Sequence, residues 1–98
     1  LELGGKSPVN VGQSADLSEV AGKVAQGKLM NAGQICLAPD YVLIDEAREG
    51  KLVDALVESA SAMYPTMLDN DDYTSVVNDR HHARLTSYIE DAKAKGAD

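Results

Sequence analysis

An uninterrupted apolar run from Tyr41 to Ile44 lies between two segments with helical periodicity, and this arrangement restricts the chain to few folds. Aspartates bound the run on both sides, which predicts a strand buried on both faces of a parallel or mixed sheet. Residues 47–64 carry the most regular helical stripe in the chain, and Pro65 ends it. The apolar positions of that stripe are Leu52, Val53, Leu56, Val57, Ala60, Met63 and Tyr64.

The first third of the chain predicts a strand followed by a helix. Apolar and polar side chains alternate over residues 7–11, which is typical of a short strand. Asp16 and the glutamate three residues later have the spacing of a capping box, so a helix is expected to start there and to end near residues 31–33. Gly22 and Gly27 each weaken this helix by roughly 1 kcal/mol relative to alanine, and they would allow a neighbouring element to pack closely.

A third helix is expected near the end of the chain. Asn78 is its predicted N-cap, the helix runs to about Lys95, and Gly96 stops it. Its expected inner face consists of Leu85, Tyr88, Ile89 and Ala92. The predicted order of strand, helix, strand, helix and helix is an α/β pattern, with two or three short strands and about three helices.

Length and charge limit the class of protein. Ninety-eight residues make at most one small domain, and a formal charge of −7 argues against binding to nucleic acid or to anionic membrane surfaces. No apolar run has the roughly 20 residues of a membrane span. One cysteine forms no internal disulfide, and no His/Cys cluster has zinc spacing. A free thiol in an acidic chain without a visible signal peptide predicts a cytoplasmic protein.

Cys36, the only cysteine, follows the small and polar stretch Asn31–Gln34 and has an apolar residue on each side. Glu2 lies 34 residues before it and is followed by the pair Gly4–Gly5. A lone cysteine is more often a small buried hydrophobe than a nucleophile, and a Glu beside two glycines is usually a strand end before a turn. A thiol and a carboxylate brought together by folding would instead suit covalent catalysis followed by base-assisted hydrolysis.

The two stretches together resemble the aldehyde dehydrogenase superfamily. LELGGKSP at residues 1–8 and NAGQ-x-C at residues 31–36 are the motifs that carry the resemblance, and it extends over essentially the whole chain. The sequences of residues 38–43 and 78–81 are most similar to those of the class 3 branch, which includes fatty aldehyde and bacterial coniferyl aldehyde dehydrogenases.

The resemblance implies that residues 1–98 are the opening half of the family's catalytic domain, a three-layer α/β unit. Leu1 is not a start methionine, so the chain is expected to be part of a longer protein whose NAD(P)-binding domain precedes it and is absent here. The strands that complete the sheet would follow Asp98. Family members form homo-oligomers, so a dimer is expected.

The resemblance also assigns roles to individual residues. Cys36 would be the nucleophile that forms a thiohemiacetal and then a thioester, and Glu2 would be the base for hydrolysis. Residues Leu3, Gly4 and Gly5 would pass under the nicotinamide of NAD or NADP, while Ile35 and Leu37 would shape the aldehyde pocket or simply pack in the core. The substrate is expected to be an aldehyde, coniferyl aldehyde being one candidate, and the isolated chain is expected to be inactive.

Two alternatives remain at this point. A Cys–Glu pair could serve a cofactor-independent thioester hydrolase or acyl-transfer enzyme, although the glycines after Glu2 would then have no role. The acidic chain could also be a non-catalytic interaction module, which has no need of a reactive cysteine.

Overall fold

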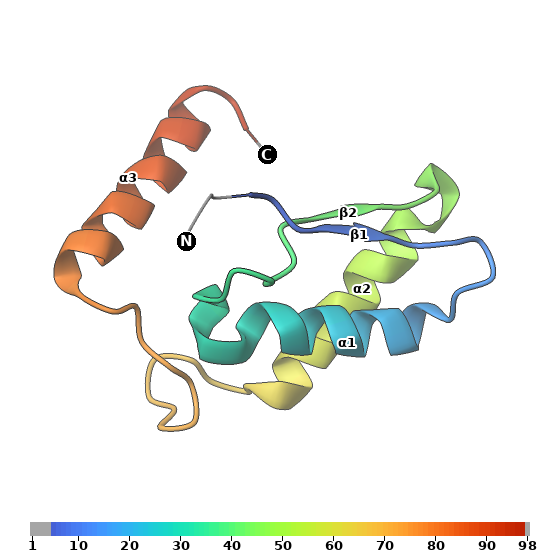
Figure 1. Ribbon diagram of the computed structural model, residues 1–98, viewed down its shortest axis with the longest axis horizontal. Coiled ribbons are helices and arrows are strands. Elements are labelled where there is room, and N and C mark those ends of the chain that lie inside the picture. Colours follow the sequence, from blue (N-terminus) through green and yellow to red (C-terminus); the bar gives the residue numbers. More distant parts are fainter. Residues whose placement is uncertain (1–4, 98) are drawn as a thin grey trace.

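The computed structural model describes residues 5–97 of the 98-residue chain, and these residues form two strands and three α-helices (Figure 1). This composition confirms the predicted α/β class. The elements in chain order are β1 (Pro8–Asn10), α1 (Leu17–Leu29), the short 3-10 segment η1 (Met30–Gly33), β2 (Tyr41–Leu43), α2 (Glu46–Met63) and α3 (Asp79–Ala94).

The two strands pair in parallel, as predicted for the apolar run. Their register aligns Pro8 with Tyr41, Val9 with Val42, and Asn10 with Leu43. Parallel strands need a crossover connection, and α1 supplies it between β1 and β2. Two backbone bonds extend the ladder at its ends: Asp40 N–H donates to Ser7 O at 2.9 Å, and Val11 N–H donates to Leu43 O at 2.9 Å.

One face of this sheet is open in the described chain, so the prediction of a strand buried on both faces is wrong here. Tyr41 and Leu43 are 47% and 55% exposed, whereas Val9 and Val42 on the other face are partly buried. Figure 1 shows α1 and α2 on one side of the sheet and no described helix over the other. β2 has apolar side chains on both faces, but residues 5–97 cover only one face, with α1 and α2, so the other face is exposed.

The core is small and lies where α1 and α2 pack against each other. Ala21 and Ala25 of α1, Leu52 of α2 and Ala38 are its buried residues in the described chain. Burial of Leu52 alone contributes about 1.5–3 kcal/mol. The small alanine side chains allow α1 and α2 to pack closely. Gly27 likewise allows the loop before β2 to pack against α1, because a Cβ built on Gly27 would lie 3.3 Å from Pro39 Cδ.

The helix ends follow the predicted capping chemistry with one exception. Asp16 Oδ1 accepts from Glu19 N–H at 2.9 Å, but Glu19 Oε1 pairs with Lys23 Nζ at 2.6 Å, so only the Asp16 half of the expected capping box forms. At α3, Asn78 Oδ1 accepts from His81 N–H at 3.0 Å. Gly96 ends α3 with a φ of 81°, as predicted.

The guanidinium of Arg48 in α2 joins the start of that helix to the turn before α1. Its Nη1 donates to Gly12 O at 2.8 Å and to Gln13 O at 2.9 Å, and its Nη2 donates to Ala15 O. One charged side chain therefore satisfies three carbonyls of the β1–α1 connection, which strengthens each bond relative to a neutral pair.

The apolar faces of α2 and α3 are less buried than the sequence predicts. Val53 and Val57 of α2 are exposed, and so are Leu85, Tyr88 and Ile89 on the expected inner face of α3. α3 contacts no other helix or strand of the described chain and stands apart in Figure 1. Periodicity identified these faces correctly as apolar, but the residues of this chain do not bury them. None of the described helices is long and apolar enough to cross a membrane.

The two glycines of α1 should respond differently to alanine. Nothing lies within 4 Å of a Cβ added to Gly22, so Gly22→Ala should stabilise the chain by about 0.5–1 kcal/mol through helix propensity. Gly27→Ala should gain less or lose stability, because the new methyl would press on Pro39 at 3.3 Å. Urea unfolding followed by circular dichroism measures both, and equal gains would contradict the close packing at Gly27.

Candidate functional site

The chain leaves α1 through three consecutive residues in the left-handed region. Asn31 has a φ of 51°, Ala32 of 54° and Gly33 of 73°. This turn ends the helix where the sequence predicts and redirects the chain toward Cys36. Glycine adopts the conformation freely, while an alanine held there costs on the order of 1 kcal/mol.

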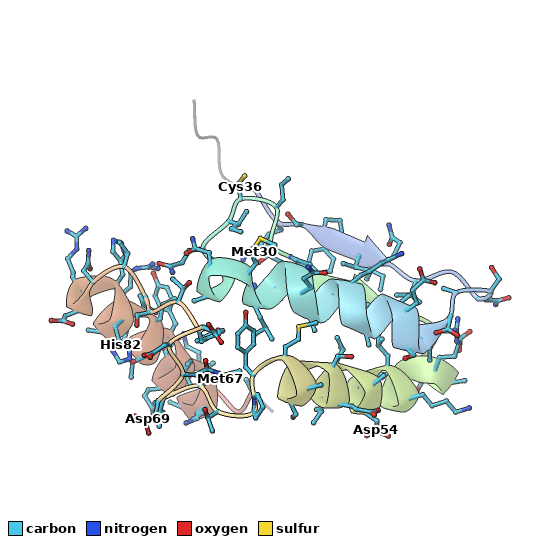
Figure 2. The ribbon with its side chains drawn as sticks, turned by 90° about the horizontal axis from the view of Figure 1, so that it is seen from below. Met30, Cys36, Asp54, Met67, Asp69 and His82 are labelled. Atoms are coloured by element: carbon cyan, nitrogen blue, oxygen red, sulfur yellow. The ribbon has the colours of Figure 1, made fainter. Side chains whose placement is uncertain are left out.

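Cys36 lies on an exposed β-turn. Ala38 N–H donates to Ile35 O at 3.0 Å, which places Cys36 and Leu37 at the two central positions of the turn. Residues 35–38 therefore form a turn and not a short helix. Ala38 is buried and anchors the turn, whereas the Cys36 thiol is free and exposed. Figure 2 shows Cys36 at the edge of the molecule, on the opposite side of α1 from Asp54 of α2.

Not all of the predicted site residues can be placed. Glu2, Leu3 and Gly4 lie outside the described residues. Gly5 has a φ of 149°, and nothing in the described chain lies within 4 Å of a Cβ added to it. Its backbone is therefore open to close approach by a ligand.

The two apolar neighbours of the thiol are both solvent-accessible. Ile35 is 36% and Leu37 79% exposed, so neither packs in the core of the described chain. Their role in an aldehyde pocket stays a prediction. A pocket of about 290 Å³ between α1, β2 and α2 is lined mainly by apolar side chains and does not include Cys36. Within residues 5–97 no group of three His, Cys, Asp or Glu could hold a metal ion.

Gln34 joins the cysteine loop to the segment before α3. Its Nε2 donates to Asn31 O at 2.9 Å and to Ser75 O at 3.1 Å, and its Oε1 accepts from Val77 N–H at 3.0 Å. The side-chain amide thus pairs with residues 75–77 much as a strand backbone would. Gln34 therefore orders the cysteine loop.

Ser7 and Asp40 connect the chain before β1 to the cysteine turn. Ser7 N–H donates to Asp40 Oδ2 at 2.9 Å, and Ser7 Oγ donates to Cys36 O at 3.3 Å. The hydrogen bond from Ser7 N–H holds the pKa of the Asp40 carboxyl below its ordinary value; partial removal from water opposes this shift, and the charges of Lys6 and Lys28 add to it. Lys28 Nζ lies 3.8 Å from Asp40 Oδ1.

The pairing of Ser7 with Asp40 is not predicted by the sequence patterns. The signal that could have found it is topological. Ser7 begins the first predicted strand and Asp40 immediately precedes the second, and parallel pairing in the observed register sets these two residues side by side. Asp40 was considered only as a boundary of the apolar run.

The described site is an exposed thiol on a tight turn of an α/β unit, with hydrogen bonds fixing both ends of the cysteine loop. Comparison with known families gives one match that covers residues 1–98, to the aldehyde dehydrogenase family. The chain belongs to this family.

Individual relatives agree with that assignment. Coniferyl aldehyde dehydrogenase of Pseudomonas sp. (strain HR199 / DSM 7063) is 55% identical over 96 residues, which are 98% of this chain and 20% of that protein. The chain thus spans about a fifth of the length of the curated relatives it matches.

Two solved structures have the same fold over this stretch. The substrate-bound state of Staphylococcus aureus AldH superposes with a TM-score of 0.85 at 37% identity, covering 95% of this chain and 20% of that one. A NAD-dependent benzaldehyde dehydrogenase from Corynebacterium glutamicum gives a TM-score of 0.77 at 31% identity, covering 97% and 21%. The arrangement of strands and helices described here is therefore that of aldehyde dehydrogenases.

The left-handed turn before Cys36 predicts opposite effects for two neighbouring substitutions. Gly33→Ala should destabilise the chain by about 1–2 kcal/mol, because of the positive φ; its Cβ would also lie 3.1 Å from Lys28 O. Ala32→Gly should instead relieve strain and gain up to about 1 kcal/mol. Denaturant unfolding of both variants tests this, and a neutral Gly33→Ala would argue against the turn geometry.

The lowered pKa of Asp40 predicts how Asp40→Asn affects stability at different pH values. A group with a lowered pKa in the folded state stabilises that state above its unfolded pKa of about 3.9, and it loses this contribution as pH falls through the folded pKa. Asp40→Asn should therefore be less stable than the parent at neutral pH, and the difference should shrink as the pH falls through the lowered pKa of Asp40. Unfolding midpoints across this range measure it; a constant difference would contradict the Asp40 contribution.

Proposed function

We propose that the full-length protein oxidises an aldehyde to a carboxylic acid with NAD or NADP, using Cys36 as the nucleophile and Glu2 as the base. The observation that carries this proposal is the position of the single thiol, exposed on a turn within a chain that matches the aldehyde dehydrogenase family over residues 1–98. Residues 1–98 would be the first part of its catalytic domain, and the cofactor-binding domain would lie elsewhere in the protein.

In the first step, the Cys36 thiolate adds to the aldehyde carbon. A C–S bond forms, the C=O π pair moves to oxygen, and a tetrahedral oxyanion results. Within residues 5–97 the Cys36 N–H donates no hydrogen bond, so it is free to stabilise this oxyanion. Exposure of the thiol on the turn allows a substrate to reach it without rearrangement of α1 or β2.

The second step needs a hydride acceptor, and the open backbone at Gly5 fits one. A side chain is absent there, φ is 149°, and no described atom would contact a Cβ, so a flat ring could lie against the chain. The chemistry that bound NAD or NADP supplies is acceptance of the hydride from the substrate carbon, as the oxyanion pair re-forms C=O and leaves a thioester on Cys36. The choice between NAD and NADP depends on residues outside this chain.

In the last step, Glu2 removes a proton from water, and the resulting hydroxide adds to the thioester carbon. The C–S bond then breaks, the electron pair returns to sulfur, and the carboxylic acid leaves with Cys36 ready for another cycle. Glu2 acts only here in this scheme, which separates its role from that of Cys36.

The substrate is proposed to be an aromatic aldehyde such as coniferyl aldehyde. A relative named for coniferyl aldehyde and a solved neighbour named for benzaldehyde support this class. Ile35 and Leu37 beside the thiol would offer apolar contacts to a ring. The isolated 98-residue chain should be inactive, and the full protein is expected to work as a homo-oligomer, a dimer in the simplest case.

Substitution of the two reactive residues in the full-length protein tests the mechanism. Cys36→Ser should reduce NAD(P)-dependent oxidation of coniferyl aldehyde to background. Glu2→Gln should allow one turnover and then slow steady-state oxidation by about 10²-fold or more, because general-base catalysis is lost. Rapid mixing with absorbance detection of reduced cofactor resolves the two phases, and Asp54→Asn on the far side of α1 is the control.

Other outcomes would favour the alternatives. Thioester cleavage that is indifferent to NAD or NADP would indicate a cofactor-independent hydrolase or acyl-transfer enzyme. Full activity of Cys36→Ser would remove the thiol from the chemistry altogether. Full-length wild-type protein that neither oxidises an aldehyde nor cleaves a thioester would support an interaction module.

A further inference from the structure

We propose that Gln34 is a positioning residue for Cys36, because its side-chain amide holds the turn that carries the thiol against residues 75–77. This role rests on the proposed function and adds a residue to it. Gln34 touches neither the substrate nor the reacting atoms in this proposal. It acts through the backbone that leads into the turn.

The amide of Gln34 reaches a segment that is distant in the sequence. Its Nε2 donates to Ser75 O at 3.1 Å, and its Oε1 accepts from Val77 N–H at 3.0 Å. These partners lie 41 and 43 positions further along the chain. A donor and an acceptor on one planar group fix its orientation as well as its distance, so the two bonds define where Gln34 lies relative to residues 75–77.

Gln34 is also bonded to the start of the cysteine loop. Its Nε2 and its backbone N–H donate to Asn31 O at 2.9 Å and 3.1 Å, and Asn31 Nδ2 donates to Gln34 O at 3.3 Å. Asn31 is the first of the three left-handed residues that lead out of α1. Such backbone is intrinsically unfavourable for residues other than glycine, so these bonds stabilise a conformation that the chain would otherwise leave.

The turn that presents the thiol depends on such external anchors. One bond closes it, from Ala38 N–H to Ile35 O at 3.0 Å. That bond fixes the shape of the turn but not its place in the molecule. Ser7 Oγ, which donates to Cys36 O at 3.3 Å, anchors the turn from the β1 side. Gln34 anchors it from the side of residues 75–77, two positions before the thiol.

The Gln34 bonds also connect the turn to α3. Residues 75–77 lead directly into Asn78, the N-cap of α3. α3 contacts no other helix or strand of the described chain. Within residues 5–97, the position of Cys36 is therefore linked to that of the segment before α3 through one side chain.

The consequence for the proposed reaction concerns geometry and not the reactivity of the thiol. Displacement of a reacting group by about 1 Å can cost about 10²-fold in rate, so release of the turn should slow addition of the sulfur to a bound aldehyde. Within residues 5–97 no bond of Gln34 involves the sulfur, and its amide carries no charge. The fraction of Cys36 that is thiolate should therefore stay the same without Gln34.

Three variants of the full-length enzyme test this role. Gln34→Met keeps the length of the side chain and removes its three hydrogen bonds. Gln34→Asn keeps the amide on a side chain one methylene shorter, so the amide loses its reach to residues 75–77. Gln26→Met is the matched control, at an exposed glutamine of α1 whose side chain makes no hydrogen bond with residues 5–97.

Two rates are compared in each variant. The first is the formation of reduced cofactor in the first turnover, after rapid mixing with saturating coniferyl aldehyde. The second is alkylation of Cys36 by iodoacetamide, followed by mass spectrometry. Q34M and Q34N should lower the first-turnover rate constant by about 10- to 10²-fold. Alkylation and the KM for NAD or NADP should stay within about threefold of wild type, because a small reagent needs only an accessible thiolate. Q26M should match wild type throughout.

A first turnover at the wild-type rate in Q34M or Q34N would overturn the positioning role. An equal fall in alkylation and in the first turnover would overturn it as well, because Gln34 would then control the reactivity of the thiol. If Q34M does not fold, as measured by circular dichroism, Q34N carries the test. Wild-type protein that oxidises no aldehyde would refute the proposed function and this role with it. An active wild type with no effect of either Gln34 variant would refute the Gln34 role alone.

Discussion

Parallel pairing of β1 with β2 is the constraint on which the rest of this structure depends. Its register sets Ser7 beside Asp40, so the segment before the first strand and the loop before the second meet at one end of the sheet. The crossover through α1 then has to turn back over the sheet, and Ala21 and Ala25 let α2 pack closely on it. Ser7 and Asp40 are 33 positions apart in the chain, and they meet because a parallel pair brings equivalent strand ends together.

The cysteine loop is held in a defined shape although it is exposed. Three left-handed residues start it, a hydrogen-bonded turn presents Cys36, and Ala38 buries its far end. Gln34 secures the loop from a different direction by pairing with residues 75–77. A thiol on a flexible loop would sample many positions, so these restraints hold Cys36 in the fixed geometry that its proposed addition to a carbonyl carbon requires.

Much of the fold was predictable because local signals agreed with one another. Helical periodicity identified all three helices, and the caps at Asp16, Asn78 and Gly96 predicted the helix ends. The errors concern burial. Tyr41 and Leu43 are apolar and exposed because the described residues supply only one layer of helices on the sheet. Periodicity shows which face of an element is apolar, but it does not show which segment covers that face.

The sequence by itself determined the identity of the chemical groups and the local structure that carries them: one thiol, a glycine in the left-handed turn before it, and a resemblance strong enough to indicate the family. These properties depend on residues near one another in the chain. Only the tertiary structure decided that Ser7 and Asp40 bond to each other and to the Cys36 peptide, and that Gln34 reaches Val77. Contacts between residues about thirty to forty positions apart depend on strand register and helix packing, which are properties of the whole fold and leave no local pattern in the sequence.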